Sequence, residues 1–507
     1  MDVTVLIALV TIVLTLIYIY FKKKYTFWAK KGVPYIEPQF LYGNGEKIIK
    51  GEISYADQFL DFYKEFKARG VRHGGVYILF SPVYIAIDPE LVRHFLQTDF
   101  DHFVNRGMYV NEEFDPLSGH LFNLEGAKWK NLRAKLTPTF TSGKMKMMFE
   151  TLKKCSVGLE QLLYECSKNE EPLDIREIIA RFTTDAIGSC AFGIECNSMK
   201  NPDAEFRKYG KKIFEVSNFN KMKQILACFI PRPLVKKLGF SFTDKDVETF
   251  FITAVRDTIA YREENNISRN DFLHLLLQLK DDCGAGGNTE NSEPHLSLNE
   301  IAAQCFVFFI AGFETSSTTT AFALYELSIN PSIQEKLREE ILSTLKKHDN
   351  EVTYESIAEM TYLEKVINEV LRKYPPVPVL NRVSNKSYKV PDSTVILNKK
   401  TPVQIPVIGL HYDPEYYPNP ETFDPERFTE ENKAKRPPFT YLPFGDGPRI
   451  CIGLRFGKLQ TKLALITILR HYNVTLNEKT KTPIQLDKKT FILSVEGGVW
   501  LNLLKLS

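Results

Sequence analysis

A single cysteine lies in a glycine-rich loop that runs directly into an apolar helical stretch. The segment FGDGPRICIGLRFG, residues 444–457, contains four glycines, one proline and Cys451. A lone cysteine is most often a small buried apolar residue. Glycine, however, is used where backbone must come close to another group, and a cysteine thiolate is a metal ligand. The loop therefore leaves two interpretations open, a structural cysteine and a ligand, and the rest of the chain has to decide between them.

The composition is that of a large globular protein, with 507 residues of which 44% are apolar and 25% charged. Beyond residue 50 no Pro/Gly/Ser-rich linker divides the chain, which favours one large body. The net charge of +3 is too small for the basic footprint of a nucleic-acid-binding protein. The eight cysteines form no C-x-x-C pair, so neither a disulfide framework nor a thioredoxin-type site is expected, and a reducing compartment fits best.

The N-terminal stretch VTVLIALVTIVLTLIYIYF, residues 3–21, has no charge and would be about 28 Å long as a helix. That length spans the apolar core of a bilayer, so we expect a transmembrane signal-anchor helix there. A cleaved signal peptide is the alternative, but the basic n-region and the cleavage site are missing. Three lysines follow the apolar run and place the body on the cytosolic side. We expect residues 22–45 to form a basic and Pro/Gly-rich spacer and residues 46–507 to form one domain.

Beyond the spacer, two apolar runs within residues 74–88 meet at Ser81 and Pro82 as a β-hairpin would. From residue 125 onward helical periodicity dominates, with a polar, glycine-rich loop at 281–295. The GAGG in that loop follows no strand, so a dinucleotide site is not predicted there. We therefore expect a mainly α fold with a small β region, and any electrons for redox chemistry must come from another protein.

A helix is predicted to begin at the capping box of Ser297 and Glu300 and to run to Pro331. Its middle, AGFETSSTTT at residues 311–320, places a glycine, an acid and six hydroxyls in an otherwise apolar helix. These hydroxyls fit either a polar surface face or a local kink around a polar pocket.

Glu369 and Arg372 stand three residues apart on one face of a second predicted helix. Alone, they form an ordinary surface ion pair. A proline-rich stretch further on carries Arg427, which could reach a buried carboxylate.

Taken in this order, the segments resemble the cytochrome P-450 superfamily of heme-thiolate monooxygenases over nearly the whole chain after the anchor. The resemblance predicts the cytochrome P-450 fold. It is carried by five motifs: the cysteine loop F-x-x-G-x-R-x-C-x-G at Phe444, Gly447, Arg449, Cys451 and Gly453; the helix motif at Ala311, Gly312, Glu314, Thr315 and Ser316; E-x-x-R at Glu369 and Arg372; the arginine of P-E-R-F at Arg427; and W-x-x-x-R at Trp129 and Arg133.

By this resemblance Cys451 is the axial thiolate ligand of heme b (iron protoporphyrin IX), with Gly447 and Gly453 giving the backbone room to approach it. Glu314 and Thr315 would deliver protons during oxygen activation, while Gly312 would leave room for O2 and water. Glu369, Arg372 and Arg427 would form a structural network behind the loop. The donors to the two heme propionates would be Trp129, Arg133, Arg382, His411 and Arg449.

The resemblance also implies partners. Electrons would come from NADPH through NADPH-cytochrome P-450 reductase, with cytochrome b5 as a second donor, in the endoplasmic reticulum membrane with the domain on the cytosolic side. Lysines that could form a positive docking face are Lys128, Lys130, Lys135 and Lys458.

The expected substrate is a lipophilic small molecule, because the segments that resemble the family's substrate-contacting regions are rich in Phe, Tyr and Leu. They are residues 100–123, 206–240, 306–315, 378–382 and 493–500. The part at 225–240 could also dip into the membrane or simply connect two helices. The residues that fill these motifs are most similar to those of insect microsomal members of the xenobiotic-metabolising clan. Oxidation of an endogenous lipid, sterol or hormone stays open, as do a non-catalytic heme or ligand carrier and a structural membrane protein.

Overall fold

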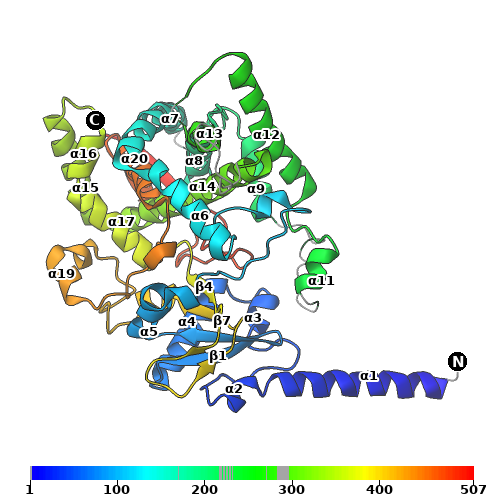
Figure 1. The fold of residues 1–507 in the computed structure, drawn as a ribbon. Coiled ribbons are helices and arrows are strands. Elements are labelled where there is room, and N and C mark those ends of the chain that lie inside the picture. The colour runs from blue at the N-terminus through cyan, green and yellow to red at the C-terminus, as the bar shows by residue number, and fades with distance from the viewer. Residues whose placement is uncertain are drawn as a thin grey trace.

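The computed structural model describes residues 3–168, 171–215, 232–269, 271–281 and 296–506, together with residues 220, 223, 227 and 230. From residue 282 onward the polar loop expected at 281–295 lies outside this description, as do residues 225, 226, 228, 229 and 231 of the segment 225–240. A helical body rises above a smaller region of β-strands, and one helix, α1 (Val3–Lys24), extends away from the β region (Figure 1). The expected mainly α fold with a small β region is confirmed.

The longer helices make up the body, and the shorter ones connect them or cap the β region. The longer helices are α4 (Tyr55–Ala68), α6 (Gly126–Leu136), α7 (Ser142–Lys168), α8 (Ile175–Ile187), α9 (Glu205–Phe214), α12 (Lys245–Glu264), α13 (Phe272–Asp281), α14 (Leu298–Ile329), α15 (Pro331–Lys347), α17 (Thr361–Lys373) and α20 (Leu454–Leu469). The shorter ones are α2 (Phe27–Lys30), α3 (Glu46–Ile49), α5 (Pro89–Arg93), α11 (Arg232–Lys237), α16 (Tyr354–Glu359), α18 (Val407–His411) and α19 (Glu430–Lys435).

The largest sheet has the order β1-β2-β7-β4, formed by β1 (His73–Ile78), β2 (Ser81–Ala86), β7 (Pro402–Pro406) and β4 (Val379–Val383). β1 and β2 form the expected antiparallel hairpin, and β7 joins β2 in parallel, with Tyr84 opposite Val403. The smaller sheets are β3-β9-β8, with β3 (Leu173–Asp174), β9 (Trp500–Lys505) and β8 (Tyr472–Leu476), and β5-β6, with β5 (Tyr388–Lys389) and β6 (Ile396–Leu397).

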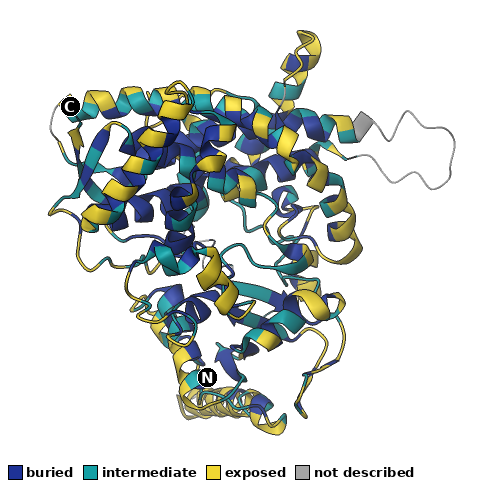
Figure 2. Ribbon diagram, turned by 90° about the vertical axis from the view of Figure 1, so that its left-hand side faces the viewer, coloured by how far each residue is buried: buried dark blue, intermediate teal, exposed yellow. Residues whose placement is uncertain are grey.

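Helix α14 is the central element of the helical body. It begins at the expected capping box, in which the Ser297 hydroxyl accepts the Glu300 backbone N–H and the Glu300 carboxylate accepts that of Ser297. It packs against α8, α12, α17 and α20, and most of its residues are buried (Figure 2). Although α14 is long and apolar enough to cross a membrane, this burial identifies it as a core helix.

The hydroxyls in the middle of α14 neither lie on a surface face nor break the helix. Thr315, Thr319 and Thr320 each donate a hydrogen bond to the carbonyl four residues earlier, at 2.6 to 2.8 Å. Such back-bonding satisfies a hydroxyl within its own helix. Most of this segment is buried, and α14 is one uninterrupted helix through it.

The segment expected to be a spacer packs against the sheet. Trp28 is fully buried, and its indole N–H donates to the Val76 carbonyl at 3.0 Å. Residues Tyr35 and Gly43 form bridges to β1, because their backbone groups pair with its edge. Residues 22–45 therefore do not form a separate spacer: from Trp28 onward they pack into the body.

Candidate functional site

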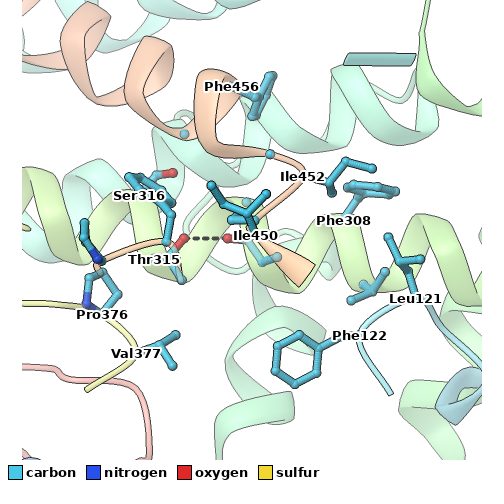
Figure 3. Close-up of a pocket in the computed structure, with 18 of the residues that line it drawn as sticks. Leu121, Phe122, Phe308, Thr315, Ser316, Pro376, Val377, Ile450, Ile452 and Phe456 are labelled. Carbon is cyan, nitrogen blue, oxygen red and sulfur yellow. Dashed lines mark hydrogen bonds between the residues drawn. The ribbon is translucent and has the colours of Figure 1, made fainter. Parts of the chain in front are cut away.

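A cavity separates the cysteine loop from α14, deep inside the molecule. Cys451, Ile450 and Ile452 line it on one side, and Thr315 and Phe308 line it on the other. Figure 3 shows Ile450, Ile452, Thr315 and Phe308, with the hydrogen bond of Thr315 beside Ile450 and with Leu121 and Phe122 at the opposite end. The two motifs that were most specific in the sequence therefore meet across one space.

The cysteine loop is held by its own backbone. The N–H of Cys451 donates to the Phe444 carbonyl at 3.0 Å, and that of Ile450 donates to the Gly447 carbonyl at 3.0 Å. Gly447 has a φ of +69°, and a Cβ there would lie 1.9 Å from the Leu96 carbonyl oxygen. Gly447 is thus required for contact with Leu96. A Cβ on Gly453 would meet no atom within 4 Å, so the space beside this glycine is open and packing alone does not require a glycine there.

Two opposing effects act on the ionisation of the Cys451 thiol: burial disfavours the thiolate, and nearby groups favour it. Burial raises the pKa of Cys451, while the backbone N–H of Gly453 and the charges of Arg106 and Arg133 act in the opposite direction. Its side chain is exposed to the cavity and lies in no disulfide. A thiol in this position is free to act as a ligand when a metal supplies the remaining positive charge.

Four arginines line the same cavity, namely Arg106, Arg133, Arg382 and Arg449. None of the described lining residues is an aspartate or a glutamate. Arg449 is stacked on Trp129, with 4.1 Å between the guanidinium carbon and the ring centroid. Arg106 was not predicted from the sequence. It lies in an irregular segment after Phe103, where neither periodicity nor a motif marks it.

Burial, together with the charges of the neighbouring arginines, lowers the pKa of Arg382 to about 9 and that of Arg449 to about 8. Arginine nevertheless keeps its proton in proteins. Within the described residues the Nε atoms of both side chains have no hydrogen-bond partner. The cluster therefore has positive charge and unpaired N–H donors that could bind anionic oxygen atoms, such as those of the two propionates of a heme.

His411 does not join this cluster, contrary to the expectation that it donates to a propionate. It is fully buried outside the cavity lining. The Leu442 backbone N–H donates to its Nε2 at 2.9 Å, so Nδ1 carries the proton and donates to the Arg372 carbonyl at 2.9 Å. Burial and the charge of Arg372 lower the pKa of His411 to about 3. Both ring nitrogens are used to join α17, α18 and the start of the cysteine loop.

The three residues expected to serve oxygen activation have different surroundings. Thr315 lines the cavity, but Glu314 points away and pairs with Arg176 of α8 at 2.8 Å. Glu314 is not among the residues that line the cavity, although its neighbours Thr315 and Ser316 are. Gly312 lines the cavity as well, and a Cβ there would lie 2.7 Å from Ile187 Cδ1, so the glycine allows close packing of α8. Its expected role toward O2 and water stays a prediction.

Behind the cysteine loop lies the carboxylate network that the sequence suggested. Glu369 and Arg372 are both fully buried and form two hydrogen bonds of 2.8 Å, while the Arg427 Nε is 3.4 Å from the Glu369 carboxylate. The Asp424 backbone N–H also donates to Glu369 at 3.0 Å. The surface-pair interpretation of this motif is therefore wrong.

The lysines expected to form a docking face are only partly available on the surface. Lys128 is exposed and pairs with Glu112 at 2.7 Å. Lys458 is mostly buried, lines the cavity and pairs with Glu364 at 2.5 Å, so it does not belong to an exposed face. Lys130 is exposed and Lys135 is half-buried.

Comparison with known proteins agrees with this geometry. The family model Cytochrome P450 matches residues 37–501. The chain is 43% identical to the probable cytochrome P450 6a23 of Drosophila melanogaster, over 99% of this chain and 100% of the relative. It is also 43% identical to cytochrome P450 6A1 of Musca domestica, over 97% and 96% of the two chains, and 42% identical to cytochrome P450 6k1 of Blattella germanica, over 96% and 94%. The chain therefore belongs to the cytochrome P450 family of monooxygenases.

Proposed function

We propose that this protein is a heme-thiolate monooxygenase that inserts one oxygen atom of O2 into lipophilic small molecules. The observation that carries the proposal is the composition of one cavity. It combines a free thiol, a cluster of arginines without a carboxylate and a helix hydroxyl. A carrier would need the first two features but has no use for Thr315 opposite the thiol.

The residues present fit a heme. Cys451 would bind its iron, and Arg106, Arg133, Arg382 and Arg449, with Trp129, would hold its propionates. When bound, the heme supplies the oxygen chemistry, and thiolate ligation favours cleavage of the O–O bond.

The chain's own residues prepare that chemistry. The walls of the cavity are mainly apolar, which excludes bulk water and favours a lipophilic substrate. Thr315 Oγ1 donates to the Ala311 carbonyl, so its lone pairs stay available to hold water at the cavity surface. Glu314, paired with Arg176, would have to leave that ion pair before it could pass a proton toward Thr315.

NADPH would provide the electrons through NADPH-cytochrome P-450 reductase, with cytochrome b5 as an additional donor. The apolar helix α1 supports attachment to the endoplasmic reticulum membrane, because none of its apolar stretch is buried in the protein. The lysines that follow its apolar part favour a cytosolic body. Oxidation of foreign compounds is the role we propose, in keeping with the resemblance to insect microsomal members of the family.

The deciding experiment is the carbon monoxide difference spectrum of the reduced protein. Thiolate ligation shifts the Soret band to the red, and Cys451→His should remove that band together with product formation. Cys166→Ser is the matched control, because Cys166 is a half-buried cysteine of α7 outside the cavity lining. If Cys451→His keeps both the shifted band and activity, the proposed ligand is wrong.

A further inference from the structure

A short loop with an apolar tip stands beside the point where α1 meets the body. Gln39 and Gly43 exchange two backbone hydrogen bonds, at 2.8 and 2.9 Å, and residues 40–42 form the loop between them. We call residues 40–42 the tip loop. Two of its side chains are large, apolar and exposed: Phe40 is 46% exposed and Leu41 44% exposed. Tight turns favour Gly, Asn, Asp and Ser, so this composition needs an explanation.

The exposure of the tip loop does not come from a loosely packed base. A Cβ on Gly43 would collide with the Tyr77 carbonyl oxygen, so the loop lies directly against β1. The Leu79 backbone N–H also donates to the Tyr42 carbonyl at 3.1 Å. Leu41 has a φ of +68°, a conformation that is strained for leucine. Strain of this kind persists only where the surrounding structure imposes it, and it is found mostly at functional positions.

The tip loop contacts the last turns of α1. The centroid of the Phe40 ring lies 5.7 Å from that of Tyr18 and 5.4 Å from that of Phe21. Phe80, in the turn between β1 and β2, lies 6.1 Å from Phe21 and 6.4 Å from Tyr20 in the same measure. Rings from the body therefore flank α1 at the point where its burial begins.

The length of α1 relates these rings to the boundary of a membrane. Residues 3–20 are all exposed and cover about 27 Å as a helix, close to the thickness of the apolar core of a bilayer. Tyrosines are enriched where this core meets the headgroups, and lysines extend their charge toward that layer. Tyr18 and Tyr20 would stand at this level, and the ammonium groups of lysines one turn later lie 5.9 and 5.5 Å from their ring centroids. Because Phe40 contacts Tyr18, the tip loop reaches the same level.

We propose that the tip loop inserts into the interfacial layer of the phospholipid bilayer and forms a second attachment beside α1. Phe40 and Leu41 enter the layer between the headgroups and the acyl chains, and the contact of the loop with β1 connects this attachment to the body. A second contact beside the helix restricts how far the body can tilt relative to the membrane. The inference rests on the membrane attachment proposed above and goes beyond it, because it assigns a lipid-binding surface to the body itself.

The test locates a tryptophan at position 41 in the full-length, heme-loaded protein, reconstituted into phosphatidylcholine vesicles. Leu41→Trp is compared in vesicles without bromine, with bromine near the headgroup end of the acyl chains, and with bromine near their methyl ends. We expect its emission to shift to the blue and to lose most intensity with the shallow bromine. The unchanged protein gives the baseline of its three native tryptophans. Intensities with and without bromine are compared within one variant, so energy transfer to the heme cancels.

Val157→Trp is the matched control, because Val157 is a 61% exposed apolar residue on α7, an element of the helical body away from α1 (Figure 1). It should show neither the shift nor the quenching. If Leu41→Trp does not fold, Phe40→Trp takes its place.

Quenching at position 41 that is absent or no stronger than at position 157 overturns the proposal. A blue shift without quenching overturns it as well, since another protein chain and not lipid would then cover the loop. Failure of the proposed membrane attachment appears separately: the unchanged protein would not float with the vesicles, and the tip loop would fail with it.

Discussion

At the residue scale, Thr315 is the hydroxyl on which the proposed oxygen chemistry depends. It lines the cavity opposite Cys451. Thr315→Ala should leave heme uptake and the carbon monoxide spectrum unchanged, because neither requires proton delivery. Product formed per NADPH consumed should fall, and hydrogen peroxide should account for the missing electrons. A positioned proton donor contributes about 100- to 10,000-fold to a rate, although other water chains can reduce that effect.

The control for this prediction is another threonine of α14. Thr320 is fully buried, bonds the Ser316 carbonyl at 2.8 Å and does not line the cavity. Thr320→Ala should keep the wild-type ratio of product to NADPH. If Thr315→Ala keeps that ratio as well, its hydroxyl only packs the helix.

Arg382 offers a test of the heme fit that is independent of turnover. Its side chain is 2% exposed and donates only to the adjacent Asn381 carbonyl, at 2.9 Å, in the described structure. Arg382→Gln should speed heme loss about 10- to 150-fold, because a charge-assisted hydrogen bond contributes about 1.5–3 kcal/mol. The heme-free protein should become no less stable, since a buried unpaired charge is removed. Heme transfer to apomyoglobin and thermal melts check the two halves; unchanged heme loss would contradict the assignment.

The motifs located the cavity residues but did not give their orientation. Cys451, Arg449 and Thr315 were found because their motifs are rigid in spacing. Glu314 precedes Thr315 in the sequence, and His411 was assigned to the site by the resemblance, yet neither lines the cavity. Side-chain direction depends on the neighbours that compete for each polar group. Arg106 was missed because it belongs to an irregular segment that tertiary packing brings to the arginine cluster.

At the scale of elements, Glu369 joins α17 to η6 (Pro425–Phe428) and to the segment around Asp424. Glu369→Ala would leave the buried Arg372 without its carboxylate, which should cost about 3–5 kcal/mol of folding free energy. We expect the variant to express mostly without heme, as judged by the heme absorbance per protein and the melting temperature.

Glu430→Ala is the matched control, since Glu430 pairs with Lys433 at the same three-residue spacing but is 92% exposed. A surface pair contributes about 0–1 kcal/mol, so heme content should stay normal. Near-normal heme content in Glu369→Ala would show that the pair of Glu369 and Arg372 contributes little to heme binding and stability.

Elements with local signals were predictable, and those fixed by distant partners were not. The capping box determines the start of α14, and the two apolar runs that meet near Ser81 indicated the hairpin of β1 and β2, whose turn lies at Leu79 and Phe80. The pairing of β2 with β7 joins segments far apart in the chain, and no local pattern specifies which edge β7 occupies. The burial of Trp28 could not be predicted either, because the residues around it are typical of a basic and Pro/Gly-rich spacer.

At the scale of the whole molecule, the apolar helix α1 and the body meet at a boundary that the packing defines. Phe21 is buried among aromatic rings that include Phe40 and Phe80, and Trp28 is buried beneath β1. Before Phe21, every described residue of α1 is exposed. The part of α1 that makes no contribution to the core therefore ends near residue 20, and the folded body begins at Phe21.

Two truncations test this boundary. Deleting residues 2–20 should weaken sedimentation with membranes but leave the carbon monoxide band and the melting temperature close to those of the full chain. Deleting residues 2–30 should also remove Trp28, and loss of a buried tryptophan costs about 3–5 kcal/mol. The full-length variant Trp28→Ala separates the two effects, because it should show the same loss of stability while staying on the membrane. Equal stability of both truncations would show that residues 21–30 are a spacer after all, whereas heme loss on deleting 2–20 would make the anchor part of the fold.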